Sequence, residues 1–244
     1  DPFNFIRPLI GYGPETMHMA YNPFYPPELA HVEARNASPD RSHNETWDSL
    51  VFTGGFGLAT YLGLFATVFY YGLKWLGLIN TNRQKIAFLA LYFGGGLLSA
   101  IAFHLWQGIA FFGVALPFGA ILGLIGYLTL SALLAKPNPE TGKYSSARSI
   151  TLIVLLAAIM AHFVEINFGI AIVATRTYFF AYAALLLAVG HFLPQRGEYL
   201  AAESKTSASS KHKRQQGKKY QRRTSQKVFW NHHIAIGSLI TAFL

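Results

Sequence analysis

Three apolar stretches with almost no charge decide what this chain can fold into. They run from Leu50 to Leu73, from Ile86 to Ala135 and from Ser149 to Leu193. About 20 apolar residues in a helix cross a bilayer, so the first stretch suits one span and each of the others suits two. Lipid offers backbone groups no partner, so spans of this length are helices. The sequence therefore predicts an all-α, polytopic membrane bundle with an irregular loop ahead of it.

The composition supports this class. Hydrophobic residues make up 52% of the 244 residues and charged residues 13%, whereas soluble domains carry roughly 25% charged residues. The chain has no cysteine, which excludes disulfides and thiolate catalysis. We expect breaks near Gln107-Gly108 and near Gly169 to Val173, a kink at Pro117, and close helix approach at glycines, which small side chains permit in lipid. These glycines are Gly94, Gly95, Gly96, Gly119, Gly123 and Gly126.

Four regions follow from this pattern. Residues 1–49 form a loop, 50–194 a five-helix transmembrane region, 195–227 a basic linker predicted to be disordered, and 228–244 the start of a further helix. Alternating crossings place three basic segments on one side, which the positive-inside rule makes cytoplasmic. These segments hold Arg83 and Lys85; Lys136, Lys143 and Arg148; and ten Lys or Arg within 195–227. We thus expect an integral protein of the cytoplasmic membrane, with residues 1–49 extracytoplasmic and 195–227 cytoplasmic.

Several smaller features have plain interpretations. The basic linker suits membrane lipids or solvent, and it lacks the fold and interleaved aromatics of a nucleic-acid-binding segment. His232-His233 beside Trp230 is expected to anchor a helix at the interface. Two glycosylation sequons begin at Asn36 and Asn44, and a glycan on Asn44 would obstruct the site proposed next. The way the chain begins and stops suggests a piece of a longer protein.

The loop carries a candidate catalytic residue. His43 stands beside Asn44, just before the first span. An imidazole titrates near pH 6.5, so His43 can act as a general base that deprotonates a sugar hydroxyl. Arg7, Arg35 and Arg41 provide guanidinium forks that match a pyrophosphate. The alternative is that His43 and Asn44 only cap the following helix while the arginines meet lipid headgroups.

Three local strings occur in a fixed order: Pro8-Leu9-Ile10-Gly11-Tyr12-Gly13, then His43-Asn44, then Gly54-Gly55-Phe56-Gly57. With them, residues 7–77 resemble the C-terminal part of the O-antigen ligase family, which is similar to O-antigen polymerases. The resemblance covers about a third of the chain. It implies a metal-independent, inverting glycosyltransferase without a cofactor, acting on the outer face of the membrane.

The resemblance also implies the substrates and the roles of residues. The donor would be a glycan on an isoprenoid pyrophosphate, and the acceptor a lipid, a protein or a second glycan. His43 matches the histidine that activates the acceptor, and Arg7 is the nearest match to the arginines that hold the pyrophosphate. Arg35, Arg41 and Asn44 complete the expected substrate-binding set. Ligase and polymerase remain alternatives.

A second polar cluster lies in the later spans: His162, Glu165 and Arg176. Ionisable residues inside a membrane are usually paired or functional. We expect Glu165 and Arg176 to pair across the helix turn, either as a structural ion pair or as part of a proton relay or headgroup clamp. His104 is expected to be a hydrogen-bonded bundle residue. Two other functions stay open: a transporter that uses this second cluster, and a non-catalytic subunit of a larger membrane assembly.

Overall fold

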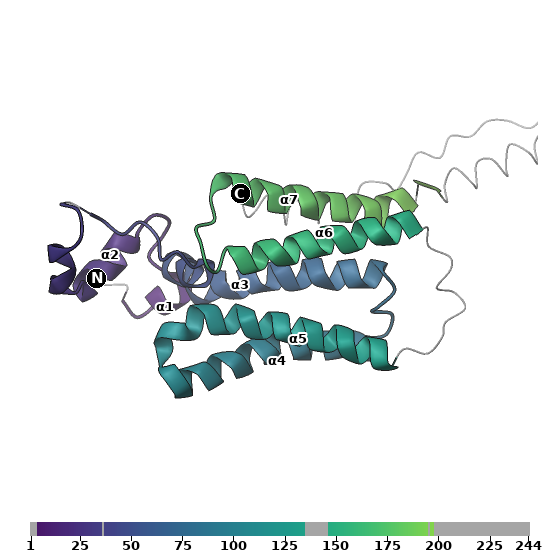
Figure 1. Ribbon diagram of the computed structural model, residues 1–244, viewed down its shortest axis with the longest axis horizontal. Helices are drawn as coiled ribbons and strands as arrows, with labels where there is room; N and C mark the ends of the chain where they lie inside the picture. Colours follow the sequence, from purple (N-terminus) through teal and green to yellow (C-terminus); the bar gives the residue numbers. More distant parts are fainter. Residues whose placement is uncertain (1–3, 36, 135–145, 195, 198–244) are drawn as a thin grey trace, which may run out of the picture. The chain divides into compact units, whose positions relative to one another are not determined.

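The computed structural model describes residues 4–35, 37–134, 146–194 and 196–197. Within these ranges the regular structure is helical (Figure 1). Five long helices are α3 (Glu45–Trp75), α4 (Asn82–Gln107), α5 (Phe112–Leu134), α6 (Ser146–Glu165) and α7 (Val173–Leu187), which continues into the π-helical turn η5 (Ala188–Phe192). All five are long and apolar enough to cross a membrane. The predicted all-α membrane bundle is confirmed.

The predicted breaks between helices are also confirmed. α4 ends at Gln107, and Gly108 follows with a φ of 78°, a left-handed conformation that glycine adopts without strain. The short 3-10 turn η3 (Ile109–Phe111) then leads into α5. α6 and α7 are separated by residues 166–172. Pro117 lies inside α5, and no described feature tests the kink expected there.

Some predictions fall on residues outside the described ranges. They concern the basic linker except residues 196–197, the sixth span with Trp230, His232 and His233, and the sequon at Asn36. Lys136 and Lys143 also lie outside these ranges.

The segment before the bundle is more regular than predicted. It contains the short helices α1 (Arg7–Ile10), α2 (Met17–Tyr21), η1 (Asn22–Phe24) and η2 (Pro27–His31). Prolines occupy the first or second position of α1, η1 and η2, where a missing N–H costs nothing and the fixed φ suits a helix. The irregular loop predicted here therefore contains short helical turns, three of which prolines help to start. α3 also begins at Glu45, five residues before the predicted Leu50.

The chain order places two connections and the segment before α3 at one end of the bundle. α3 and α5 run away from this end, α4 and α6 return to it, and α7 leaves it again (Figure 1). We call it the loop-bearing end, and it holds residues 4–44, residues 108–111 and residues 166–172. The α3–α4 turn (residues 76–81) lies at the opposite end.

Aromatic packing joins α3 to α6 and α7. The buried side chains of α3 recur at helical spacing, at positions 58, 62, 65, 69 and 73. The Phe65 ring lies 4.4 Å from Phe163 of α6 and 4.9 Å from Phe179 of α7, between centroids. These tilted contacts are the geometry that aromatic pairs prefer. They form the centre of the apolar core.

Glycines instead hold α4 against α5. A Cβ atom at Gly119 would meet the Gly95 carbonyl and Ser99, and one at Gly123 would meet the Leu91 carbonyl. The two backbones thus approach each other closely at these glycines, which the sequence predicted. Gly94 and Gly126 have no atom within 4 Å of such a Cβ, so these two glycines do not serve this packing.

Candidate functional site

Asn44 fixes the start of α3 to two other segments. Its Oδ1 accepts from the backbone N–H of Trp47 at 2.9 Å and caps the helix. Its Nδ2 donates to the carbonyl oxygens of Gly113 at 3.0 Å and Asn167 at 2.8 Å. Gly113 is four residues before Pro117, whose missing N–H leaves that carbonyl without its helical donor. The Asn44 amide supplies this donor and ties α3 to α5 and to the α6–α7 turn.

The next residues of α3 extend these contacts. Thr46 donates to Oδ1 of Asn167 at 2.7 Å, and the backbone N–H of Glu45 donates to the Ile166 carbonyl at 3.0 Å. Nδ2 of Asn167 donates to the Phe163 carbonyl at 2.7 Å and to the Tyr61 hydroxyl at 3.2 Å. Five polar residues are buried at this position, and we call them the polar clasp: Asn44, Glu45, Thr46, Asp48 and Asn167.

Asp48 fixes the residue on the other side of His43. Its Oδ1 accepts from the backbone N–H of Ser42 at 2.8 Å. The Ser42 hydroxyl lies 2.7 Å from the same oxygen and 2.9 Å from the Asn44 carbonyl. Both neighbours of His43 are therefore held by hydrogen bonds.

His43 itself is exposed and has a strained backbone. Its φ is 58°, a left-handed value that is uncommon for a residue with a side chain. Its imidazole makes no hydrogen bond or ion pair with any residue that the structure describes, while Asn44 beside it is only 6% exposed. Strained conformations persist where the surroundings determine them, and they cluster at functional sites. The clasp thus holds the backbone on both sides of His43 and leaves its imidazole exposed.

Asn44 is not available to bind a substrate, contrary to its place in the predicted set. Its amide is buried and uses both its oxygen and its nitrogen within the fold. The expected helix-capping role is confirmed instead. The same burial keeps a glycosylating enzyme from reaching this nitrogen in the folded protein.

A break in α3 holds the N-terminal segment. Gly54 has a φ of 66° inside the helix, so carbonyls before it are free for other donors. Those of Val51 and Phe52 accept from the N–H groups of Tyr12 at 2.8 Å and Gly13 at 2.9 Å. A Cβ at Gly11 would meet the Phe52 backbone, and one at Gly54 would meet the Leu9 backbone. The two glycine strings noted in the sequence therefore pack against each other.

Two of the predicted arginines lie at this junction. The Arg7 guanidinium lies 5.1 Å from the centre of the Tyr12 ring and donates to the Gly11 carbonyl at 3.1 Å. The Arg41 guanidinium lies 5.7 Å from the Phe52 ring, 2.8 Å from Glu15 and 3.9 Å from Asp48. Arg41 is thus partly neutralised by carboxylates and serves to hold the loop on α3.

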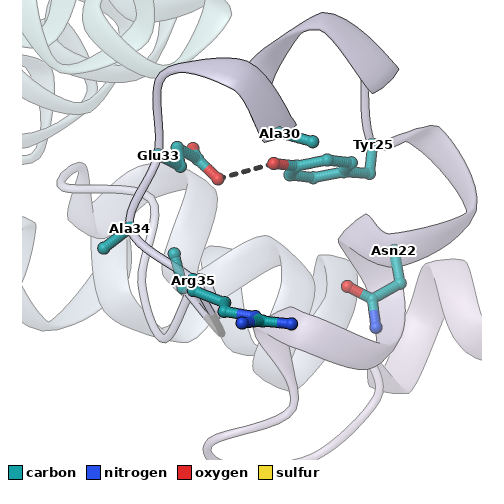
Figure 2. A pocket seen from close by; sticks show the side chains of 7 residues that line it. Asn22, Tyr25, Ala30, Glu33, Ala34 and Arg35 are labelled. Atoms are coloured by element: carbon teal, nitrogen blue, oxygen red, sulfur yellow. Dashed lines mark hydrogen bonds between the residues drawn. The ribbon is translucent and has the colours of Figure 1, made fainter.

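Arg35 lies elsewhere in the segment, beside a hollow of about 430 Å³. Figure 2 shows Arg35 and Asn22 pointing toward one another on one side, and Tyr25 and Glu33 joined on the other. The Tyr25 hydroxyl donates to Oε2 of Glu33 at 2.7 Å. This bond and the Glu33 charge raise the pKa of Tyr25 to about 12. The residues that surround the hollow are Asn22, Tyr25, Ala30, Glu33, Ala34, Arg35 and Ala37.

The expected pair of Glu165 and Arg176 is not formed. Arg176 instead binds Oε1 of Glu45 at 2.8 Å, and Glu165 lies 3.6 Å from Nδ1 of His162. The His162 ring also stacks on Phe179, with centroids 5.6 Å apart. Arg176 lies in the first turn of α7, where the start of α3 offers a buried carboxylate. Oε2 of Glu45 is buried and has no hydrogen-bond partner.

Sequence reasoning missed Ser42, Asp48, Asn167 and Gly113. Two acids in the first turn of a helix were a usable signal, since the helix dipole favours them there. Asn167 is a polar residue inside an apolar stretch, which was a second signal. Within the described ranges, no three His, Asp or Glu side chains are placed to hold a metal ion. Comparisons with protein-family models, curated proteins and solved structures found no match.

Proposed function

We propose that this protein is a membrane glycosyltransferase of the O-antigen ligase type, with its reaction centre at the loop-bearing end. The observation that carries the proposal is the conformation and exposure of His43. Its imidazole is exposed, and its backbone is held at a φ of 58° between two locked residues. Catalytic groups gain from positions that are fixed before the substrate arrives.

The proposed reaction transfers a glycan from an isoprenoid pyrophosphate to a hydroxyl group. A nitrogen of His43 takes the proton of the acceptor hydroxyl as its oxygen attacks the anomeric carbon. The bond from that carbon to the pyrophosphate oxygen breaks, and the lipid pyrophosphate leaves with the electron pair. Attack from the opposite side inverts the anomeric configuration.

The arginines have different proposed roles. We assign the pyrophosphate to Arg7, because the string that follows it docks on α3 beside the clasp. Arg41, which is bound to Glu15, positions the loop. The acceptor would be a sugar of a lipid or second glycan, or a protein hydroxyl.

The orientation in the membrane is part of the proposal. The loop-bearing end would face outward from the cytoplasmic membrane. The described basic residues of the opposite end support this: Lys74, Arg83, Lys85 and Arg148. Labelling a cysteine introduced at Ser38 or Asn80 with an impermeant reagent tests it. Labelling at Asn80 but not Ser38 in intact cells would reverse the orientation.

A reconstituted transfer assay tests the reaction. Proteoliposomes would receive an undecaprenyl-pyrophosphate oligosaccharide and three acceptors: a lipid-core oligosaccharide, a serine peptide and a second lipid-linked glycan. We expect His43→Ala to reduce transfer about 100-fold or more, as loss of a general base does. The exposed His31 offers a matched control, and His31→Ala should transfer normally. Normal turnover by His43→Ala would rule the proposal out.

The same proteoliposomes test the other two functions. A transporter that uses His162 and Glu165 would lose solute or proton flux in Glu165→Gln while His43→Ala kept it. A non-catalytic subunit would show neither activity and would copurify with stoichiometric partners.

A further inference from the structure

The hollow between η1 and η2 combines three kinds of side chain. Tyr25 supplies an aromatic ring, Glu33 supplies an acceptor, and Asn22 and Arg35 supply donors. Its volume of about 430 Å³ falls in the range of roughly 300–1,000 Å³ that small-molecule sites occupy. It lies in the segment before the membrane spans, where a water-soluble group has access.

One wall of the hollow is already fixed. Tyr25 donates to Oε2 of Glu33 at 2.7 Å, and its ring also meets Tyr21 edge-on, with centroids 6.0 Å apart. Because Oε2 is engaged, Oε1 of Glu33 remains to accept a hydrogen bond. The opposite side holds the Arg35 guanidinium, which forms no hydrogen bond or ion pair with the rest of the described chain. Asn22 lies next to it (Figure 2).

These groups decide the class of ligand. A simple anion needs only donors, and the Glu33 carboxylate would repel it. A sugar hydroxyl donates and accepts at once, so neighbouring hydroxyls need both kinds of partner. Asn22 offers both, Arg35 offers donors and Glu33 an acceptor. The aromatic ring suits the apolar face of a pyranose, since large rings contribute contact area at small entropic cost.

We infer that this hollow binds one neutral pyranose unit of a glycan substrate. The inference rests on the proposed glycosyl transfer and adds a specificity site away from His43. The hollow would recognise the glycan by one of its sugars, while the reacting end of the glycan extends to the clasp.

Direct binding tests the inference without any catalysis. The protein in lipid nanodiscs would be titrated with maltotriose, mannotriose and chitotriose, three neutral trisaccharides, and observed by saturation-transfer NMR. Nanodiscs are required because maltoside detergents carry the same kind of sugar. We expect at least one trisaccharide to bind, and Tyr25→Ala and Arg35→Ala to raise its dissociation constant about fivefold or more. Phe24→Ala is the matched control, because Phe24 is 78% exposed and does not line the hollow.

Tyr25→Phe guards against a folding artefact. It keeps the ring and removes the bond to Glu33, so it should bind more tightly than Tyr25→Ala. Three outcomes would overturn the inference: no binding of any trisaccharide, equal binding by Tyr25→Ala and Arg35→Ala, or displacement of the sugar by millimolar inorganic pyrophosphate. The last would make the hollow an anion site.

The outcomes separate this inference from the proposed reaction. His43→Ala should bind the trisaccharide normally, because His43 does not line the hollow. If the wild-type protein binds the trisaccharide but transfers no glycan, the proposed reaction is ruled out and the sugar site is supported. Transfer with unchanged kinetics in Arg35→Ala would overturn the sugar site and leave the proposed reaction standing. In the transfer assay, a raised KM for the donor or for the acceptor tells which glycan occupies the hollow.

Discussion

The polar clasp and the α4–α5 hairpin are held together in opposite ways. In the clasp, the buried side chains of Asn44, Thr46 and Asn167 join α3, α5 and the α6–α7 turn through directed hydrogen bonds. In the hairpin, glycines without a Cβ let the two helix backbones approach closely. Directed bonds fix a particular atom in space, whereas backbone contact fixes only the distance between helices. The exposed His43 lies next to the polar clasp, where directed hydrogen bonds hold both of its neighbours.

The comparison predicts that the clasp is more sensitive to a single polar change than the hairpin is to a single methyl group. Asn44→Ala removes the α3 cap and the donor to the orphaned Gly113 carbonyl. We expect it to lower the free energy of unfolding by about 3 kcal/mol, from the cap and the buried acceptors together. Denaturation in nanodiscs would measure this.

A second variant divides that effect. Asn44→Ser keeps a capping acceptor for the Trp47 N–H and removes the amide that donates to the Gly113 and Asn167 carbonyls, so it isolates the contacts to α5 and the turn. We expect about 2 kcal/mol of the loss to remain, with reduced transfer activity because His43 is no longer fixed. If Asn44→Ser were as stable as the wild type, Asn44 would be only a helix cap.

The ion pair of the clasp gives the next largest effect. Arg176→Leu leaves the buried Glu45 carboxylate without its partner. Breaking a fully buried pair costs about 3–5 kcal/mol, but the Arg176 side chain is 48% exposed. We therefore expect about 2 kcal/mol.

A double-mutant cycle measured by thermal unfolding checks the assignment of partners. The double change Glu45→Leu with Arg176→Leu should recover most of the stability, because no buried charge remains. Glu165→Leu with Arg176→Leu is the matched control and should be additive. Coupling of Arg176 to Glu165 instead of Glu45 would contradict the arrangement at this end.

The hairpin gives a smaller effect. Gly119→Ala places a methyl group against the Gly95 carbonyl and Ser99, and we expect a loss of about 1–2 kcal/mol. Gly126→Ala is the matched control on the same helix, with nothing within 4 Å. It should be neutral or slightly stabilising, because alanine favours a helix more than glycine does. Equal stabilities of the two variants would show that the helices are not packed through Gly119.

The two regions also differ in how far the sequence predicts them. Helix positions follow from apolar length, and the role of Gly95, Gly119 and Gly123 follows from small side chains in a span. The clasp depends on contacts between segments more than 60 residues apart, such as Asn44 with Gly113 and Asn167. Helical periodicity does not encode such contacts.

The ion pair illustrates the same limit. Glu165 and Arg176 flank one turn, so sequence reasoning paired them. The structure brings a third segment, the start of α3, to that turn, and Glu45 of this segment forms the ion pair with Arg176. The sequence singled out the His43-Asn44 pair, but the fold was needed to show that the imidazole is exposed and the amide buried.

The smallest predicted effect concerns the hollow, which belongs to neither region. Its Tyr25 donates to Glu33, and the bond and the nearby charge raise the pKa of Tyr25 from 10.0 to about 12. A group whose pKa is raised on folding adds stability that is complete below its unfolded pKa and is lost as pH rises through its folded pKa. The contribution of this bond should therefore fade between about pH 10 and pH 12.

Because the chain has 13 tyrosines, the signal is the difference between the ultraviolet titrations of the wild-type protein and Tyr25→Phe. In Glu33→Gln, which removes the charge, that tyrosine should titrate closer to pH 10. A Tyr25 that titrates near pH 10 in both backgrounds would show that the two side chains do not meet in solution, and the wall of the hollow would not be fixed in advance.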